Sequence, residues 1–213
     1  MRAALYGSRP DGHANVVLEV FGGEGSGMEI VGLIDDWAEN AGRRIGQLEV
    51  IGGAADLAWL AGEGLEGVLL GFGAAKGRRE AIEAVEAAGL QLPVLVHETA
   101  HVAASASLAA GTQILPNASV GPNARLGRGA LVNTGAVVEH DVSLEDCSVV
   151  DPGAVLTGRV RVGPSVEIGS GAVLIPDVEI GGGATVGAGA VVIGDVAEGV
   201  TVVGVPARPL DWV

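Results

Sequence analysis

The sequence is poor in cysteine, aromatic residues and positive charge, and each shortage narrows what the protein can be. Cys147 is the single cysteine, which excludes a disulfide within one chain and suits a cytoplasmic protein. Neither half of the chain contains a block of Lys or Arg, and the formal net charge is −14. Nucleic acids and anionic membranes are therefore expected to be poor partners.

Long apolar runs are also missing. No stretch reaches the about 18 apolar residues that a membrane-spanning helix needs, so we expect no membrane insertion. The first residues lack a cationic start followed by an apolar run, so we expect no signal peptide. A chain of 213 residues can still form one or two domains with a sizeable core.

What the sequence does contain is a six-residue repeat. From Val102 to Val192, all sixteen residues at a spacing of six are aliphatic. The position four residues after each is small or β-branched, from Ala106 to Val196. A period of six fits neither an α-helix nor a strand of an open sheet, but it is typical of a parallel β-helix built of hexapeptides. Such a fold also explains the 36 glycines and the 3% aromatic content, because its corners need glycine and its interior is narrow.

Three hexads make one coil of such a fold, so the repeat predicts a little over five coils, each rising about 4.8 Å. The repeat lapses after Val196, where the next position in phase is Glu198. We therefore expect the tail, residues 199–213, to cover or flank the C-terminal end of the coils.

The first hundred residues lack the repeat and alternate between strand-like and helix-like segments. We expect strands at 2–6, 30–34, 48–51, 68–72 and 93–96, and helices at 15–21, 55–61 and 76–88. This alternation predicts a small parallel sheet with flanking helices, a Rossmann-like α/β fold. The expected domains are thus an α/β domain at 1–97 and a β-helix domain at 98–213.

Polar and glycine-rich segments follow three of the expected strands. They are Gly7–His13, Asp35-Asp36 and Gly52-Gly53. Because parallel sheets bind ligands at the carboxyl ends of their strands, this clustering favours a nucleotide or nucleotide-sugar site. The first loop is not a good GxGxxG fingerprint and could be an ordinary turn. The acidic pair could equally be a solvated strand end, and His13 a helix-capping residue rather than a phosphate contact.

His140 is the only histidine between Val102 and the C-terminus, and Asp141 follows it. Both are out of phase with the inward positions, so we expect them to face outward. A solvated turn histidine is the ordinary interpretation. However, a neighbouring carboxylate can orient an imidazole and stabilise its protonated form, as a general base requires. Cys147 is interpreted as a passive thiol, with a covalent nucleophile as the remote alternative.

Several motifs carry a family resemblance along the whole chain. They are YG…GHA near the start, LIDD at 33–36, IGG at 51–53, VLVHETAHVAASASL at 94–108, VVEHD at 137–141, DPGAVLTG at 151–158, VGAGAVV at 186–192 and GVPAR at 204–208. In this order they resemble the left-handed β-helix sugar acyltransferases, among them sialic acid O-acetyltransferases and N-acetyltransferases of nucleotide-linked 4-amino sugars. The resemblance implies an acetyl-CoA-dependent N-acetyltransferase, trimeric, with no metal.

The resemblance also implies roles for individual residues. His140 would be the general base, Asp141 would raise its basicity, and the Gly158 amide would stabilise the oxyanion. The acetyl-CoA arm would pass Ser170 and Ala188 and reach the tail. The remaining positions are Gly204, Pro206 and Arg208 for the adenosine end, and Gly12, His13, Asp35, Asp36 and Gly53 for the nucleotide sugar.

Two positions depart from the family pattern. Val149 replaces a histidine that contacts acetyl-CoA in many relatives, so that contact is missing or supplied otherwise. Asn15 stands at the usual cation position of the first loop, which leaves phosphate binding there in doubt, although Arg9 could supply the charge.

Three other functions stay open from the sequence. O-acetylation of sialic acid or another sugar hydroxyl shares all the motifs. A non-catalytic nucleotide-sugar-binding or assembly protein could use the same scaffold. A zinc hydratase needs about three histidine ligands around one metal, and the repeat contains only His140, with His101 at its edge.

Overall fold

The computed structural model describes residues 1–9, 12–22 and 27–210. The chain forms two compact units, residues 1–93 and residues 94–213. No helix among the described residues is long and apolar enough to cross a membrane. The Gly7–His13 segment and the tail include residues 10–11 and 211–213, so those parts of the two predictions lie outside the described residues.

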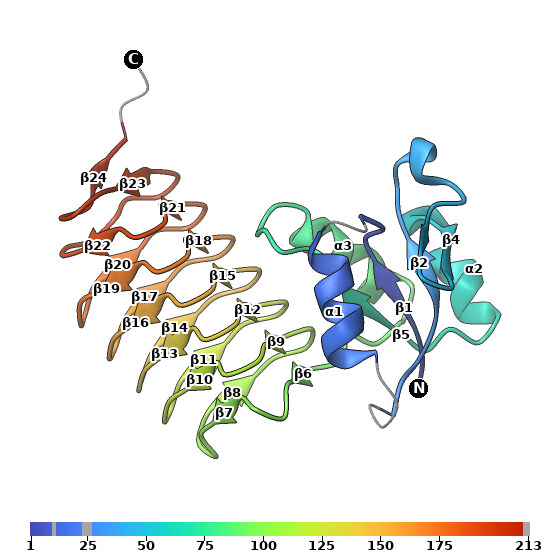
Figure 1. The fold of residues 1–213 in the computed structure, drawn as a ribbon, viewed down its shortest axis with the longest axis horizontal. Helices are drawn as coiled ribbons and strands as arrows, with labels where there is room; N and C mark the ends of the chain where they lie inside the picture. Colours follow the sequence, from blue (N-terminus) through green and yellow to red (C-terminus); the bar gives the residue numbers. More distant parts are fainter. Residues whose placement is uncertain (10–11, 23–26, 211–213) are drawn as a thin grey trace. The chain divides into compact units, whose positions relative to one another are not determined.

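Unit 1 is an α/β fold around one sheet (Figure 1). In its described residues the strands are β1 (Arg2–Tyr6), β2 (Glu29–Ile34), β3 (Arg44–Ile45), β4 (Leu48–Gly52) and β5 (Gly67–Leu70), in the order β3-β4-β2-β1-β5. The helices are α1 (His13–Phe21), α2 (Leu57–Gly62) and α3 (Arg78–Ala87), with short 3-10 helices η1 (Ala38–Asn40) and η2 (Ala54–Asp56). β1, β2, β4 and β5 pair in parallel, while β3 pairs antiparallel with β4 at the edge.

The burial pattern explains this sheet. β1 lies inside the sheet, between β2 and β5, and every residue from Ala3 to Tyr6 is buried, as expected for a parallel strand covered on both faces. α1 buries Ala14, Val17 and Phe21, a helical spacing that places all three on one face.

Unit 2 is a parallel β-helix, as the repeat predicts, and the left-handed form is the one that the family resemblance implies. One of its sheets contains β7 (His101–Val102), β10 (Ser119–Val120), β13 (Val137–Val138), β16 (Val155–Leu156), β19 (Val173–Leu174) and β22 (Val191–Val192). A second contains β8 (Ser107–Leu108), β11 (Arg125–Leu126), β14 (Ser143–Leu144), β17 (Arg161–Val162) and β20 (Glu179–Ile180). The third contains β6 (Leu95–Val96), β9 (Gln113–Ile114), β12 (Leu131–Val132), β15 (Val149–Val150), β18 (Glu167–Ile168), β21 (Thr185–Val186), β23 (Thr201–Val203) and β24 (Arg208–Pro209).

One expected strand belongs elsewhere. Residues 93–96 were expected to close the N-terminal sheet, but β6 pairs in parallel with β9 and so forms the first rung of the β-helix. The β-helix therefore begins before residue 98. The three apolar residues after Pro93 could pair with a strand of either unit. Their pattern alone therefore did not identify the sheet to which they belong.

The inward aliphatic residues stack coil upon coil, eighteen residues apart, as in the pairing of Val120 with Val138 and of Val138 with Leu156. The small residues four positions later complete the same core. Two of these are polar, Thr112 and Ser148, and each hydroxyl donates to a backbone carbonyl at 2.7 Å. The buried hydroxyls are thus satisfied without disturbing the apolar stack.

The corners of the coils form three columns of residues with positive φ. In the described coils two columns are mainly glycine: Asn117, Gly135, Gly153, Gly171 and Gly189 form one, and Gly111, Gly129, Cys147, Ser165, Gly183 and Gly199 the other. The third contains Asn123, Asp141, Arg159 and Asp177, with φ between 59° and 69°. We call this set the polar corner column. A left-handed conformation costs a residue with a side chain roughly 1–2 kcal/mol, so the column retains polar side chains against a backbone preference for glycine.

The tail extends the β-helix by one rung. β23 pairs in parallel with β21, and β24 folds back antiparallel on β23. Val202 is 4% exposed and joins the stacked core. The described part of the tail thus flanks the C-terminal end of the coils, as predicted.

Candidate active site

His140 and Asp141 form an exposed pair at one corner of the β-helix. The Nδ1 atom of His140 lies 2.8 Å from Oδ2 of Asp141, and both side chains are 46% exposed. The backbone of Asp141 is in the left-handed region, at φ 59°. With Nδ1 held by the carboxylate, Nε2 is the ring atom that can accept a proton from a ligand.

Gly158 lies against the other side of the same ring. A Cβ atom built on Gly158 would overlap Nε2 and Cε1 of His140, so only glycine leaves room for the imidazole in this position. Within the described chain, no hydrogen bond uses the Gly158 amide, while its carbonyl accepts from the Asp177 amide at 3.2 Å. A proton acceptor and an unengaged N–H donor are thus neighbours, which is the arrangement that acyl transfer requires.

Asp141 has a hydrogen-bond donor and a cation as neighbours in the polar corner column. Asn123 Nδ2 donates to its Oδ1 at 3.1 Å. The hydrogen bond with His140, then that with Asn123, lowers the pKa of Asp141 below its ordinary value. Arg159 adds a smaller favourable charge, while its guanidinium is paired in two hydrogen bonds of 2.7 and 2.8 Å with Asp177. Asp141 therefore remains ionised beside the histidine.

Asp151 is a second perturbed carboxyl group of the β-helix. Burial, then the nearby charge of Glu167, raises its pKa from 3.8 to about 6, against a hydrogen bond from Asn133. The sequence interpretation named the DPG segment only as a motif. The signal that could have found Asp151 is its place one coil after Asn133, at the same corner.

Unit 1 contains a cleft of about 1180 Å³ at the carboxyl ends of its strands. Its walls come from the segments after β1, β2 and β5, including Gly7, Asp35 and Gly71. The chain passes from β1 outward to β2 and β4, then returns to β5 on the other side of β1. The cleft therefore lies at the topological switch point, where open α/β sheets bind ligands.

The two aspartates of this cleft are held by different partners. Asp35 accepts hydrogen bonds from Ser8, from Asn40 at 2.8 Å and from the Trp37 amide at 3.0 Å. Burial works to raise the pKa of Asp35, but these hydrogen bonds outweigh it and hold the pKa below the ordinary value.

Asp36 has fewer partners than Asp35. It accepts from the Tyr6 hydroxyl and, at 2.7 Å, from the Ala54 amide. Burial and the Asp36 hydrogen bond raise the pKa of Tyr6, which remains a neutral donor. Asp36 thus retains acceptor capacity for a ligand.

His13 is the first residue of α1 and lines the cleft, but its ring is largely buried. Within the part of the chain that the structure describes, its buried Nε2 has no hydrogen-bond partner. Burial, then the charge of the fully buried Arg78, lowers the pKa of His13 to about 4. His13 is therefore neutral near pH 7. The alternative interpretation, a partly exposed capping residue, fails on the capping role, because the N-cap of α1 is Gly12.

Of the other residues predicted for the cleft, some line it and one does not. Gly12 lines the cleft as the N-cap of α1, and Arg9 lines it as well. Gly53 does not line it: its amide donates to Asp56 at 2.9 Å, and it packs behind Asp36. Gly53 therefore shapes the site through Asp36.

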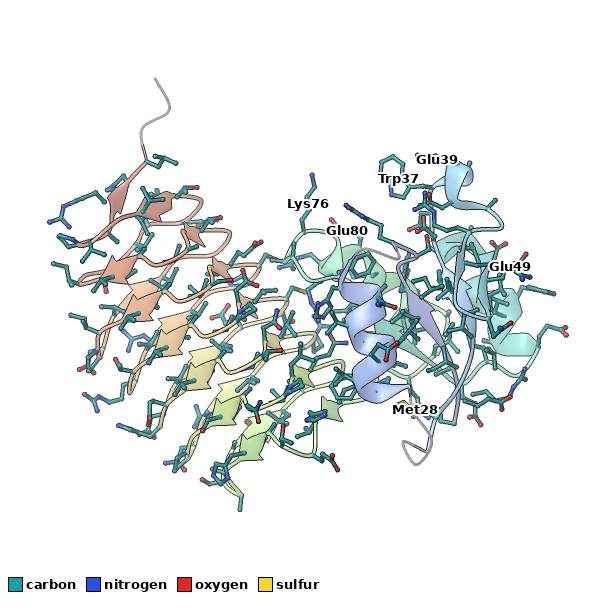
Figure 2. All side chains as sticks on the ribbon, viewed as in Figure 1. Met28, Trp37, Glu39, Glu49, Lys76 and Glu80 are labelled. Atoms are coloured by element: carbon teal, nitrogen blue, oxygen red, sulfur yellow. The ribbon has the colours of Figure 1, made fainter. Side chains whose placement is uncertain are left out.

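Sequence reasoning missed several lining residues, among them the exposed Trp37. Trp37 is 68% exposed and follows the aspartate pair directly. In Figure 2, Trp37, Glu39 and Lys76 project at the upper edge of unit 1, and all three line the cleft. The available signal was the scarcity of aromatic residues, which makes an exposed tryptophan beside a predicted site informative.

The five residues expected to hold acetyl-CoA are all on the surface of unit 2. Ser170 and Ala188 are exposed and occupy the same corner of consecutive coils. Gly204 and Pro206 are exposed in the turn between β23 and β24, and Arg208 is exposed at the start of β24. They can offer backbone groups and one cation to an extended ligand.

The thiol of Cys147 and possible metal ligands are the remaining candidates for chemistry. Cys147 is buried at 2% exposure, so its thiol does not face solvent. Residues 1–9, 12–22 and 27–210 contain no cluster of three His, Cys, Asp or Glu side chains that could hold a metal ion.

Comparisons with known proteins bear on the whole chain. The family model for the bacterial transferase hexapeptide (six repeats) matches residues 159–194. The sequence matches none of the curated proteins with which it was compared.

Solved structures match over nearly the full length. A variant of perosamine N-acetyltransferase from Caulobacter crescentus, in complex with CoA and GDP-perosamine, is 30% identical, with a TM-score of 0.91 over 99% of this chain and 97% of that chain. The acetyltransferase domain of PglB from Neisseria gonorrhoeae is 36% identical, with a TM-score of 0.87 over 98% of each chain. WeeI from Acinetobacter baumannii is 25% identical, with a TM-score of 0.85 over 99% of this chain and 100% of that chain.

These matches confirm the resemblance drawn from the motifs, since they extend through both units at 30% identity or more in two cases. The hexad array, the corner histidine and the α/β cleft now have a common explanation: the chain belongs to the hexapeptide-repeat family of sugar acetyltransferases.

Proposed function

We propose that the protein transfers the acetyl group of acetyl-CoA to the 4-amino group of a nucleotide-linked deoxy-amino sugar. The observation that carries this proposal is the His140–Asp141 pair, whose ring lies against Gly158 with its unengaged amide. The related enzyme from Caulobacter, in complex with CoA and GDP-perosamine, supports this choice of substrates.

The reaction is a direct transfer. The neutral amine attacks the thioester carbonyl carbon, and the carbonyl electrons move to the oxygen, which the Gly158 amide stabilises. His140 accepts the proton of the amine at Nε2, while Asp141 holds Nδ1 and stabilises the imidazolium. The intermediate collapses by breaking the C–S bond, and the proton passes from His140 to the departing thiolate. No acyl-enzyme forms, and no metal takes part.

The cleft of unit 1 is proposed to hold the nucleotide. The exposed indole of Trp37 offers a stacking surface for the base, and Asp36 has acceptor capacity for base or ribose hydrogens. Arg9, Arg43 and Lys76 also line the cleft and supply positive charge for the diphosphate. Gly12 and His13 at the start of α1 add the N-terminal end of a helix, which favours anions.

On unit 2, acetyl-CoA is proposed to run past Ser170 and Ala188 to the hairpin of Gly204, Pro206 and Arg208. The half-exposed His140 also suggests a homotrimer, because a neighbouring β-helix would supply the wall that one coil surface lacks. A cytoplasmic location is part of the proposal, supported by the single cysteine, which excludes a disulfide within one chain. Light scattering on the purified protein tests the trimer against the chain mass of 21.1 kDa.

The test is a thiol-release assay with acetyl-CoA and a panel of acceptors: GDP-, UDP- and dTDP-linked 4-amino-4,6-dideoxy sugars, and free sialic acid. Wild type is expected to release CoA with one nucleotide-linked amine. His140→Ala should lose about 10²–10⁴-fold in kcat, the usual contribution of a general base, while His101→Ala, an exposed histidine outside the proposed site, should not. Release with sialic acid alone would move the protein to O-acetylation, and no release with any acceptor would overturn the proposal.

Binding measurements separate loss of chemistry from loss of structure. Two variants of the Caulobacter enzyme, with asparagine or alanine in place of one histidine, are in complex with CoA and GDP-perosamine. His140→Ala is therefore expected to bind both ligands by calorimetry. The wild-type rate should also fall at low pH, because the attacking amine must be neutral and a general base must be free to accept a proton, and a flat profile would contradict the mechanism.

A further inference from the structure

The corner residue one coil before Asp141 makes a contact that the proposed mechanism does not use. Asn123 lies eighteen residues before Asp141 in the polar corner column, and its Nδ2 donates to Asp141 Oδ1 at 3.1 Å. The other carboxylate oxygen, Oδ2, is 2.8 Å from His140 Nδ1. Each oxygen of Asp141 thus has its own hydrogen bond, which fixes both the position and the rotation of the carboxylate plane.

The conformational preference of the corner does not by itself explain the contact. Asparagine tolerates the left-handed region better than most residues, which could account for its presence at φ 59°. Asn117 occupies an equivalent corner at φ 60°. The two are matched in backbone as well: the Asn117 amide donates to Thr99 Oγ1 at 3.0 Å and the Asn123 amide to Ser105 Oγ at 3.1 Å. They differ in the corner residue one coil later, which is Gly135 for Asn117 and Asp141 for Asn123.

The two charged side chains near the pair, Arg159 and Glu139, do not fix the orientation of the Asp141 carboxylate. Arg159, one coil after Asp141, is engaged by Asp177 in two hydrogen bonds and reaches Asp141 only through its charge. Glu139 accepts from the His140 backbone amide at 3.4 Å, which does not touch the ring. Without Asn123, the attraction of Arg159 would act on a carboxylate free to rotate away from the imidazole.

We infer that Asn123 is a positioning residue that holds the Asp141 carboxylate in the orientation that aligns His140 for proton transfer. It acts through Asp141 and touches neither substrate. The inference rests on the proposed function for its kinetic consequence, but the arrangement of the three side chains can be tested without any reaction.

The kinetic test compares Asn123→Ala and Asn123→Asp with the matched variants Asn117→Ala and Asn117→Asp. Asn123→Ala is expected to lower kcat about tenfold, as for one hydrogen bond to a charged group, with KM changed by less than about twofold. The acid limb of the pH profile should move to lower pH, because a loosened carboxylate stabilises the imidazolium less. In Asn123→Asp it should move to higher pH, because a second carboxylate stabilises the imidazolium more. Both Asn117 variants should behave as wild type.

An NMR titration of the His140 ring, assigned with His140→Gln, tests the same inference when no acceptor is turned over. The midpoint of the imidazole titration should fall in Asn123→Ala, rise in Asn123→Asp and stay unchanged in both Asn117 variants. Opposite shifts at position 123 alone establish the positioning role even if the proposed reaction fails. Equal kinetic losses at positions 117 and 123, or midpoints that coincide in all variants, would overturn the inference.

Discussion

In the β-helix, the candidate site residues occupy equivalent corners of successive coils, whereas in the α/β unit they come from loops far apart in the sequence. Asn123, Asp141 and Arg159 succeed one another at intervals of eighteen, and each contacts or faces the next. The cleft of unit 1 instead joins the segments after β1, β2 and β5. The β-helix presents its reactive groups on an open, periodic surface. Unit 1 instead forms a cleft where the chain returns from β4 to β5 on the other side of β1.

This difference indicates where a substitution should affect each unit. Each coil of the β-helix packs against its two neighbours, so a change at one corner acts on the coils next to it. The cleft depends on the whole sheet. Substitutions in the two units can strengthen or weaken this comparison, and their expected effects range from a loss of activity to a small change in pH dependence.

Gly158→Ala should have the largest effect. The added methyl group would overlap the His140 ring and displace Nε2 from the proton-transfer position, so kcat should fall about 10²-fold or more. Nucleotide binding by unit 1, measured by calorimetry, should not change. Gly194→Ala is the matched control, since it lies at the same corner two coils later with nothing within 4 Å of an added Cβ. Equal activity of the two variants would disprove the role given to this contact.

Leu126→Ala tests whether the units are independent. Leu126 is 3% exposed in the stacked core, so its truncation should destabilise unit 2 by about 2–5 kcal/mol. Arg125→Ala, the exposed neighbour in β11, should change stability by less than about 0.5 kcal/mol. Circular dichroism in guanidinium chloride would follow the coils.

Tryptophan fluorescence would follow unit 1 in the same experiment. In a Trp212→Phe background the remaining tryptophans, Trp37 and Trp59, both belong to unit 1. The fluorescence transition should not move in Leu126→Ala. A shift equal to that of the circular dichroism transition would mean that both units unfold as one cooperative structure. The two units would then not be independent in stability.

Trp37→Ala should weaken binding of the nucleotide diphosphate about tenfold, the effect of losing one base-stacking surface. Trp59→Ala is the control, because Trp59 is similarly exposed, at 63% against 68%, and does not line the cleft. Calorimetry with GDP and UDP measures both variants. Equal affinities in all three proteins would argue that the base does not stack on Trp37.

The two units should respond to pH in opposite directions, with small effects. Burial and Arg78 lower the pKa of His13 from 6.5 to about 4, so the unfolded chain takes up a proton first. Unit 1 should therefore lose stability as the pH falls from 6.5 toward about 4. Burial and Glu167 raise the pKa of Asp151 from 3.8 to about 6, so unit 2 should lose stability as the pH rises from 3.8 to about 6.

Two substitutions isolate these contributions. His13→Gln should flatten the pH dependence of the unit 1 transition, followed by fluorescence in the Trp212→Phe background. Asp151→Asn should flatten that of the unit 2 transition, followed by circular dichroism. Slopes that both substitutions leave unchanged would show that other groups govern the pH response.

The sequence predicted the β-helix almost completely, because an inward aliphatic residue at every sixth position leaves one periodic solution. It also predicted His140 and Asp141 as an outward pair, since both are out of phase with the core. It did not predict the Asn123 contact, because the pairing of corners one coil apart depends on side-chain orientation as well as on spacing. The strand at 93–96 was assigned to the wrong sheet, since a short apolar run does not identify its partner.

The cleft of unit 1 was predicted in part, from the glycine and aspartate segments after the strands. Trp37 and Lys76 were missed because a lining residue is defined by the folding of distant loops around one cavity. Gly53 lies behind Asp36 for the same reason: its segment reaches the correct edge of the sheet, but η2 turns its amide toward Asp56. Strand order predicted the region of the site, while the loops decided which side chains enter it.

The stacking of coils converts chain length into distance along a surface. His140 and Arg208 lie on different rungs, and each added coil of eighteen residues would separate them by about 4.8 Å without changing the neighbours within any existing coil. A duplication of the DNA that encodes one coil could therefore lengthen the surface in a single genetic event. In this architecture, the span available to an extended ligand can evolve separately from the chemistry at the corner.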